Sequence, residues 1–417
     1  MKLLLSLFAF CAVASLSAQK TMTLRDCIER AQQRNIKVQQ ADLARRQQEI
    51  QLDDARKAML PEVGGSAGEN LSFGRGLTAN NTYETRNTNS TSLSISGSMP
   101  LYTGGRIAHR RKQAALQLQA AGADAQRIAE ELQLQVAQAY YQVLFRMDLI
   151  AQAQTNLRNT LAQEERMAAQ IRAGRLPEVD LAQARARTAQ DRLALVQAEN
   201  DKMIALLELS QLLEYPSPDS LAVAPPATHT LPAVPGNPEE IYALSLTERP
   251  ALQAAQLRSR AADEQIELAR AGMRPTLSLN AGLGTSYYHT SGIDNAAIGR
   301  QLRDNFSQNI GLSLSVPLYD RRATRNSVAQ AQLAAANARL DEEEARKSLY
   351  KEIQSAYYAA VTSRHKWEAA QVADSAAVTA AQLAQKKYEA GELKVDAATR
   401  WAQSAARILT MSFNNGG

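Results

Sequence analysis

The chain has 417 residues, of which 45% are hydrophobic and 21% charged, and this balance excludes an intrinsically disordered protein. The formal net charge of +5 is small for this length, and no basic cluster with interleaved aromatic residues accompanies it, so we expect no nucleic-acid partner. Two cysteines exclude a disulfide framework, while aromatic residues at only 5% favour long, closely packed helices over a large compact core.

The N-terminal segment, residues 1–18, is predicted to be a signal peptide. Lys2 supplies a positive start, an apolar stretch runs from Leu3 to Leu16, and Ala18 offers a small residue for cleavage before Gln19. The alternative, a short membrane anchor, is disfavoured because a spanning helix needs about 20 apolar residues. We therefore expect an exported chain that is either soluble outside the cytoplasm or held in a membrane as a β-barrel.

The remaining chain repeats itself. Several short motifs recur at one offset of 217 positions, which chance rarely produces over more than a hundred residues. The pairs are Pro100-Leu101-Tyr102 with Pro317-Leu318-Tyr319, Ala139-Tyr140-Tyr141 with Ala356-Tyr357-Tyr358, and Ala173-Gly174 with Ala390-Gly391. We predict a first repeat at 19–213, a linker or equatorial segment at 214–247, and a second repeat at 248–417.

Each repeat is predicted to begin with a helix, 24–59 or 250–273, that a proline closes. Two segments of strictly alternating polar and apolar residues follow, which is typical of strands with one apolar and one wet face. These strands are expected at about 65–73 and 91–101 in the first repeat and at about 276–288 and 308–318 in the second. The long polar loops between the partners, 74–90 and 290–305, suit the outside of a cell.

A very long helical hairpin completes each repeat. Residues 107–172 contain no proline and a single glycine, and their apolar positions step by three or four as in a coiled coil. At about 1.5 Å per residue, such a helix reaches about 100 Å. The second repeat has its counterpart at 324–390, and returning helices are expected at 178–213 and 395–411.

Four strands cannot close a barrel, and a sheet inside lipid cannot leave open edges because no water is present to bond its free N–H and C=O groups. If these strands lie in a membrane, several chains must therefore share the barrel. Two chains would supply eight strands, which their own side chains fill, whereas three would supply twelve and leave a lumen. The predicted fold class is thus mainly α with a trimeric membrane β-barrel.

The duplication, the Pro-Leu-Tyr-x-Gly-Gly sequence at Pro100 to Gly105 and the turns at Gly174…Asp180 and Gly391…Asp396 resemble the outer-membrane efflux protein family of the TolC type. The resemblance covers nearly the whole mature chain. It implies a homotrimer whose twelve strands form an outer-membrane barrel that twelve helices continue as a periplasmic tunnel. It also implies an exit duct for a tripartite pump or a type I secretion system, working with a periplasmic adaptor (membrane fusion) protein and an inner-membrane transporter, in contact with outer-membrane lipid.

The turns of the two hairpins are candidates for adaptor docking and gating. Exposed apolar and charged residues at the tips suit an adaptor's helical hairpins: Gly174, Arg175, Leu176, Gly391, Leu393 and Lys394. By the resemblance, Asp396 matches an acidic side chain that narrows the tunnel, Tyr388 matches an aromatic of the closing network, and Asp180 is the first-repeat counterpart. Asp396 either lines this gate or only caps the N-terminus of the returning helix.

Other motifs favour structural interpretations. Gly64-Gly65-Ser66-Ala67-Gly68 fits a hydrolase elbow only if a helix follows, and here a strand is expected. The four histidines show no ligand spacing, so we predict neither a metal site nor a cofactor. Arg110-Arg111-Lys112 and Arg321-Arg322 are interpreted as solvated charge or as contacts with anionic lipid headgroups. We predict a channel and no enzyme; the alternative is a periplasmic coiled-coil adaptor or structural protein without a barrel.

Overall fold

The computed structural model describes residues 20–77, 81–174, 177–225 and 236–389. It divides into two compact units. The first contains the chain up to Ala41, Ala125–Thr247 and the chain from Ser348, and the second contains Asp42–Asp124 and Glu248–Lys347. Each unit is described by itself.

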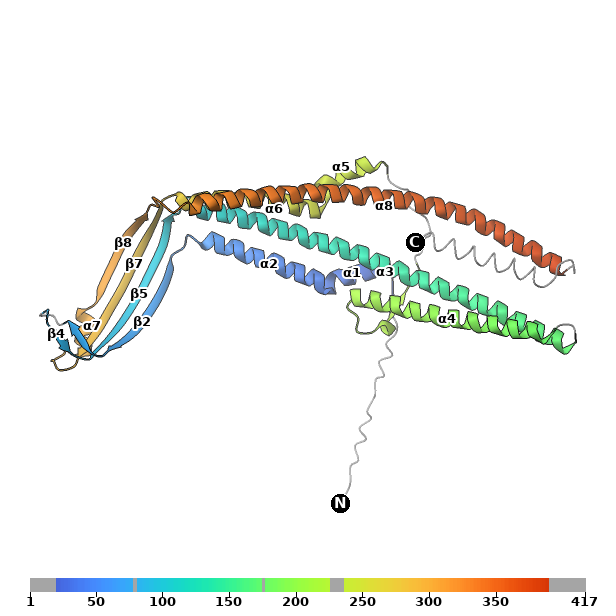
Figure 1. Cartoon of the computed structure of the whole chain (residues 1–417), viewed down its shortest axis with the longest axis horizontal. Helices are drawn as coiled ribbons and strands as arrows, with labels where there is room; N and C mark the ends of the chain where they lie inside the picture. The colour runs from blue at the N-terminus through green and yellow to red at the C-terminus, as the bar shows by residue number, and fades with distance from the viewer. Residues whose placement is uncertain (1–19, 78–80, 175–176, 226–235, 390–417) are drawn as a thin grey trace, which may run out of the picture. The chain divides into compact units, whose positions relative to one another are not determined.

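A four-stranded sheet dominates the second unit (Figure 1). Its strands are β2 (Glu62–Ser72), β5 (Thr88–Tyr102), β7 (Thr276–Thr290) and β8 (Ser307–Ser315). They lie in the order β2-β5-β7-β8, and every neighbouring pair is antiparallel. The two strands expected from each repeat therefore join in one sheet, and β5–β7 is the pair that links the repeats.

The segments predicted to be long polar loops contain regular structure. Between β2 and β5, the short strands β3 (Arg75–Leu77) and β4 (Tyr83–Thr85) form an antiparallel pair. Between β7 and β8 lies the helix α7 (Ile298–Asp304). Asn305 donates a side-chain hydrogen bond to the carbonyl oxygen of Ser286 at 2.7 Å, which ties the end of α7 to β7.

Two helices of 67 residues follow the strands: α3 (Arg106–Arg172) after β5 and α8 (Ala323–Glu389) after β8. The helix α4 (Glu178–Leu212) returns from α3. In the second unit, α2 (Ile36–Lys57) precedes β2, while α6 (Pro250–Arg270) and the 3-10 turn η2 (Ala271–Met273) precede β7. Of the helices in the described part of the chain, none combines the length and the apolar character needed to cross a membrane.

The first unit holds the main apolar core. Leu132, Val136 and Val143 of α3 and Leu209 of α4 are 0–2% exposed and pack together with residues of α1 (Leu24–Arg34). The ring of Tyr140 is buried in the same core, and its hydroxyl donates to the carbonyl oxygen of Ala224. The apolar positions that step along the predicted seam thus form this core at the middle of α3.

The segment predicted to be a linker, 214–247, is in part built into this core. It contains the 3-10 turn η1 (Pro218–Ser220), the strand β6 (Leu221–Val223) and, at its end, the helix α5 (Pro238–Glu248). β6 pairs in parallel with β1 (Lys20–Met22), and Leu221 and Val223 are buried. Two alternating apolar side chains of this segment thus find a partner strand about 200 residues away in sequence, and its assignment as a linker or equatorial segment stays a prediction.

The helix predicted at 24–59 is divided into two helices, α1 and α2, because the helical backbone is interrupted at Asn35. This residue has an extended backbone with φ −62° and ψ 132°, and its side-chain oxygen accepts from the backbone N–H of Lys37 at 2.9 Å. Its side-chain amide donates to the carbonyl oxygen of Leu212 at 3.0 Å. Asn35 therefore caps the start of α2 and binds the last turn of α4, which a single continuous helix would not allow.

Candidate functional site

The two faces of the sheet differ in chemistry. The register places Leu93 opposite Ala67 and Thr285, and Ile95 opposite Gly65 and Leu283, so these side chains share an apolar face. The intervening positions form a polar face of small hydroxyl, amide and glycine residues. That polar face includes Ser66, Ser92, Ser94, Ser96, Ser98, Asn280, Gly282, Asn309 and Ser313.

The apolar face is uncovered. Val63 is 68% exposed, Ile310 78% and Leu312 66%, and none of these side chains packs into either core cluster. Among the described residues, no strand pairs with the outer edge of β2 or of β8. The sheet therefore presents a broad apolar face and two open edges, which a soluble monomer rarely tolerates.

A pair of left-handed residues turns the chain from β5 into α3. Gly104 has φ +63° and Gly105 has φ +88°. A Cβ atom on Gly104 would lie 2.5 Å from the Cβ of Arg274, so this position must be glycine for both backbone and packing reasons. The Arg274 guanidinium donates through Nη1 to the Gly104 carbonyl oxygen at 2.9 Å, which ties the turn to the segment that leads into β7.

Polar contacts also join α3 to α6. His109 Nδ1 lies 2.7 Å from Glu264 Oε2, and the two side chains are 21% and 23% exposed. One turn further, the Gln113 amide donates to Gln265 Oε1 at 3.0 Å. These contacts fix the register of the two helices directly below the sheet.

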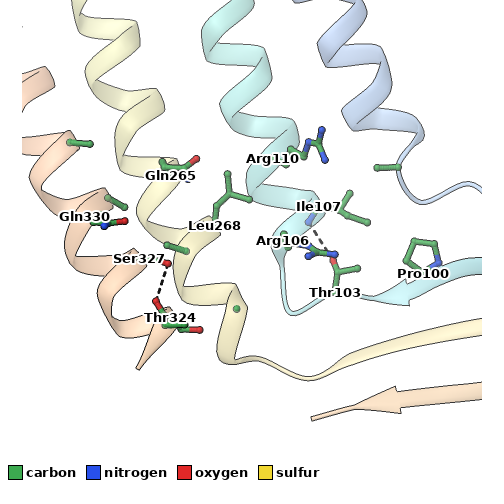
Figure 2. A pocket seen from close by; sticks show the side chains of 16 residues that line it. Pro100, Thr103, Arg106, Ile107, Arg110, Gln265, Leu268, Thr324, Ser327 and Gln330 are labelled. Carbon is green, nitrogen blue, oxygen red and sulfur yellow. Dashed lines mark hydrogen bonds between the residues drawn. The ribbon is translucent and has the colours of Figure 1, made fainter. Parts of the chain in front are cut away.

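A cavity of about 990 Å³ lies at this junction (Figure 2). Its wall is built by α3, α6, α8 and Ala58, and Figure 2 shows Pro100 at the end of β5 beside it. The charged side chains in its lining are Arg106 and Arg110 of α3. Of the predicted basic group Arg110, Arg111 and Lys112, only Arg110 lines the cavity. In the sequence, the i, i+4 spacing of Arg106 and Arg110 indicates that these two side chains are neighbours on one face of the helix.

Three of the predicted docking and gate residues belong to the described part of the chain: Gly174, Asp180 and Tyr388. Gly174 has φ +75°, is exposed, and donates its N–H to the carbonyl oxygen of Ile171 at 2.8 Å. Asp180 lies half-buried in the first turn of α4, where a carboxylate favours the helix dipole. Tyr388 belongs to the last turn of α8. The other predicted residues lie outside the described ones: Arg175, Leu176, Gly391, Leu393, Lys394 and Asp396.

The remaining reactive side chains have structural surroundings. Cys27 is fully buried in the core of the first unit, and this burial, with the nearby Asp26 carboxylate, raises the pKa of its thiol to about 11. Within the described ranges, no three histidine, cysteine or acidic residues gather as metal ligands would. Ser66 stands inside β2, with its hydroxyl 2.7 Å from that of Ser94, so the strand–turn–helix geometry of a hydrolase elbow is not present there.

The described chain is a protein with one four-stranded antiparallel sheet, two helices of 67 residues, and a hairpin formed by α3 and α4. The profile of the family "Outer membrane efflux protein" matches residues 27–214 and 241–411, and the chain therefore belongs to that family. It is 28% identical over 319 residues to the outer membrane protein TolC of Escherichia coli, covering 73% of this chain and 61% of TolC. It is 24% identical over 362 residues to the outer membrane efflux protein BepC of Brucella suis, covering 87% of this chain and 74% of BepC.

The fold agrees with solved structures. A membrane protein from Pseudomonas aeruginosa superposes with a TM-score of 0.80 at 22% identity, covering 94% of this chain and 86% of that one. The resemblance drawn from the duplicated motifs is thereby confirmed, and so is the expected outer-membrane location, since the matched relatives are outer membrane proteins.

Proposed function

We propose that this protein is the outer-membrane exit duct of a tripartite efflux pump or a type I secretion system. The observation that carries this function is the sheet, which has one apolar face, one polar face and two open edges. Lipid covers an apolar face of this kind, and a neighbouring chain satisfies each edge.

The proposed assembly is a homotrimer. Three copies of the β2-β5-β7-β8 sheet supply twelve strands, with β8 of one chain beside β2 of the next. Their polar faces then line a lumen wide enough for solutes, and the helices continue it as a periplasmic tunnel. The alternative of a periplasmic adaptor without a barrel leaves the apolar face in water.

The duct performs no reaction and takes no cofactor; an inner-membrane transporter supplies the energy. A periplasmic adaptor docks at the hairpin tips, around Gly174 to Leu176 and Gly391 to Lys394. Asp396, with Tyr388 and Asp180, closes the periplasmic end. These roles rest on the family resemblance and on the turn at Gly174, whose exposed left-handed backbone suits a tip.

The test is the mass and conductance of the detergent-purified protein. We expect three times the mature chain mass, an oligomer on gels that heating dissociates, and discrete conductance steps in planar bilayers. A stable, monodisperse monomer that still conducts would rule out the shared barrel. A trimer that never conducts would rule out the duct.

A further inference from the structure

We propose that the cavity at the junction of sheet and helices binds a soluble multivalent anion bearing phosphate or carboxylate groups, and that Arg106 and Arg110 hold it. The inference rests on the proposed duct, because that assembly turns the cavity toward a lumen.

The charged residues that line the cavity are all basic. Arg106 and Arg110 are the charged residues among its lining, and they lie four positions apart on α3, where side chains are neighbours. In the described part of the chain, neither guanidinium has an ion-pair partner. Like charges at this spacing repel one another, so a bound anion would stabilise both.

Three other arginines of the second unit are paired with carboxylates. Arg258 contacts Asp124, Arg339 Nη2 lies 2.7 Å from Asp263 Oδ1, and Arg274 Nη2 lies 3.6 Å from Glu267 Oε2. The two arginines that line the cavity have no such carboxylate partner among the described residues.

Two acids on the elements around the cavity are engaged elsewhere. Asp320, before α8, accepts from the Thr324 backbone N–H at 2.7 Å, and the hydrogen bond from the Thr324 side chain holds the pKa of this carboxyl below its usual value. Asp320 thus caps α8. Glu264 pairs with His109 on the side of α3 that faces α6. Neither acid lines the cavity.

Neutral donors complete the site. Gln265, Gln330 and Thr324 line the cavity. Gln265 uses its oxygen to accept from Gln113, so its own NH₂ group is left to donate. Two guanidinium groups with the side-chain amides of the glutamines form a set that matches phosphate or carboxylate oxygens.

The cavity adjoins the polar face of the sheet. Pro100, which lines the cavity, is paired with Ser278 and follows Ser98 on that face. Among the described strand positions on the polar face, the one acidic residue is Glu62, which lies opposite Ser98. Three chains would therefore place six guanidinium groups and three such carboxylates at one level of the lumen, an excess of positive charge that attracts anionic cargo.

The experiment measures binding of inorganic pyrophosphate to the full-length trimer by calorimetry, in dodecyl maltoside at low salt. We expect saturable binding that weakens with added salt and that drops at least roughly tenfold in the variant Arg106→Gln/Arg110→Gln. The matched control Arg111→Gln/Lys112→Gln removes the same charge from the same helix turn outside the cavity. It should stay within about twofold of the wild type.

Absence of saturable binding in the wild type, or equal loss in both double variants, would overturn the proposal. Trimers in nanodiscs test whether the two arginines belong to lipid phosphates instead. If phosphatidylglycerol discs abolish the binding that phosphatidylcholine discs retain, headgroups occupy the site and the proposal fails. If the wild-type trimer conducts but does not bind pyrophosphate, only the anion site is refuted. If the protein forms no conducting trimer, the proposed duct function is refuted.

Discussion

Gly104 and Arg321 occupy equivalent places in the two repeats, 217 positions apart, and both have a left-handed backbone, with φ of +63° and +54°. The next residues, Gly105 and Arg322, repeat the match with φ of +88° and +67°. The duplicated turn from strand to long helix has thus kept its backbone while its residues changed. Glycine is required in the first copy because Arg274 packs against it, whereas Arg321 and Arg322 are exposed.

This relationship predicts opposite effects of substitutions in the two turns. Gly104→Ala should lower the free energy of unfolding by about 2 kcal/mol or more, because left-handed strain of about 1–2 kcal/mol adds to the clash with Arg274. Arg322→Gly should leave stability unchanged or raise it by up to about 1 kcal/mol. The heat dissociation temperature of the trimer measures both changes. A Gly104→Ala trimer as stable as the wild type would contradict the packing argument.

The two faces of the sheet should respond differently to charge. Ile95→Arg places a cation on the apolar face and should cost about 2–4 kcal/mol at mid-membrane depth, so the amount of assembled trimer in outer membranes should fall. Ser96→Arg is the matched control, since Ser96 lies on the polar face opposite Gly64 and Gly282, where space is available. Equal assembly of both variants would show that the apolar face does not meet lipid.

The hairpin tips should be required for the pump and not for the barrel. Gly174→Val puts a β-branched residue at φ +75°, which strains the turn; among the described residues other than its chain neighbours, no atom lies within 4 Å of the added Cβ position. We expect loss of efflux with the trimer still in the membrane, and the same for Gly391→Val. Drug-accumulation assays with membrane fractionation provide the measurement. Normal efflux in both variants would exclude docking at these tips.

Asp396 is predicted to form the gate. Three carboxylates at an assumed ~7 Å and a dielectric of ~20 repel by about 2 kcal/mol per pair, which favours a multivalent cation in the ring. The wild type should be cation-selective and blocked from the periplasmic side by trivalent cations in planar bilayers, and Asp396→Asn should lose both properties. If selectivity and block survive in that variant, Asp396 is only a helix cap.

The buried thiol should be inert at neutral pH. Because the pKa of Cys27 is raised to about 11, a very small fraction of it is thiolate at pH 8, and iodoacetamide should label it far more slowly in the native protein than in denaturant. The same shift makes the folded state less stable as pH rises above about 8.5, where the unfolded thiol ionises first. Mass spectrometry of timed labelling checks the first effect, and rapid native labelling would contradict the burial of Cys27.

The sequence by itself was sufficient to predict the four strands and the two long helices, while the bounds of the two repeats stay a prediction. These elements depend on local patterns. Polar and apolar residues alternate along β5, and apolar residues recur every three or four positions along α3. Proline or glycine marks the ends of elements. The family followed from the same motifs, since their order along the chain is preserved.

Only the tertiary structure decided which distant residues meet. Asn35 breaks a helix because the carbonyl of Leu212 lies beside it, and Leu221 becomes core because Lys20 to Met22 supply a parallel partner strand. Arg110 differs from Arg111 because only Arg110 lines a cavity to which three helices, α3, α6 and α8, contribute. Such contacts join residues far apart in sequence, and their energy depends on packing geometry that no local pattern records.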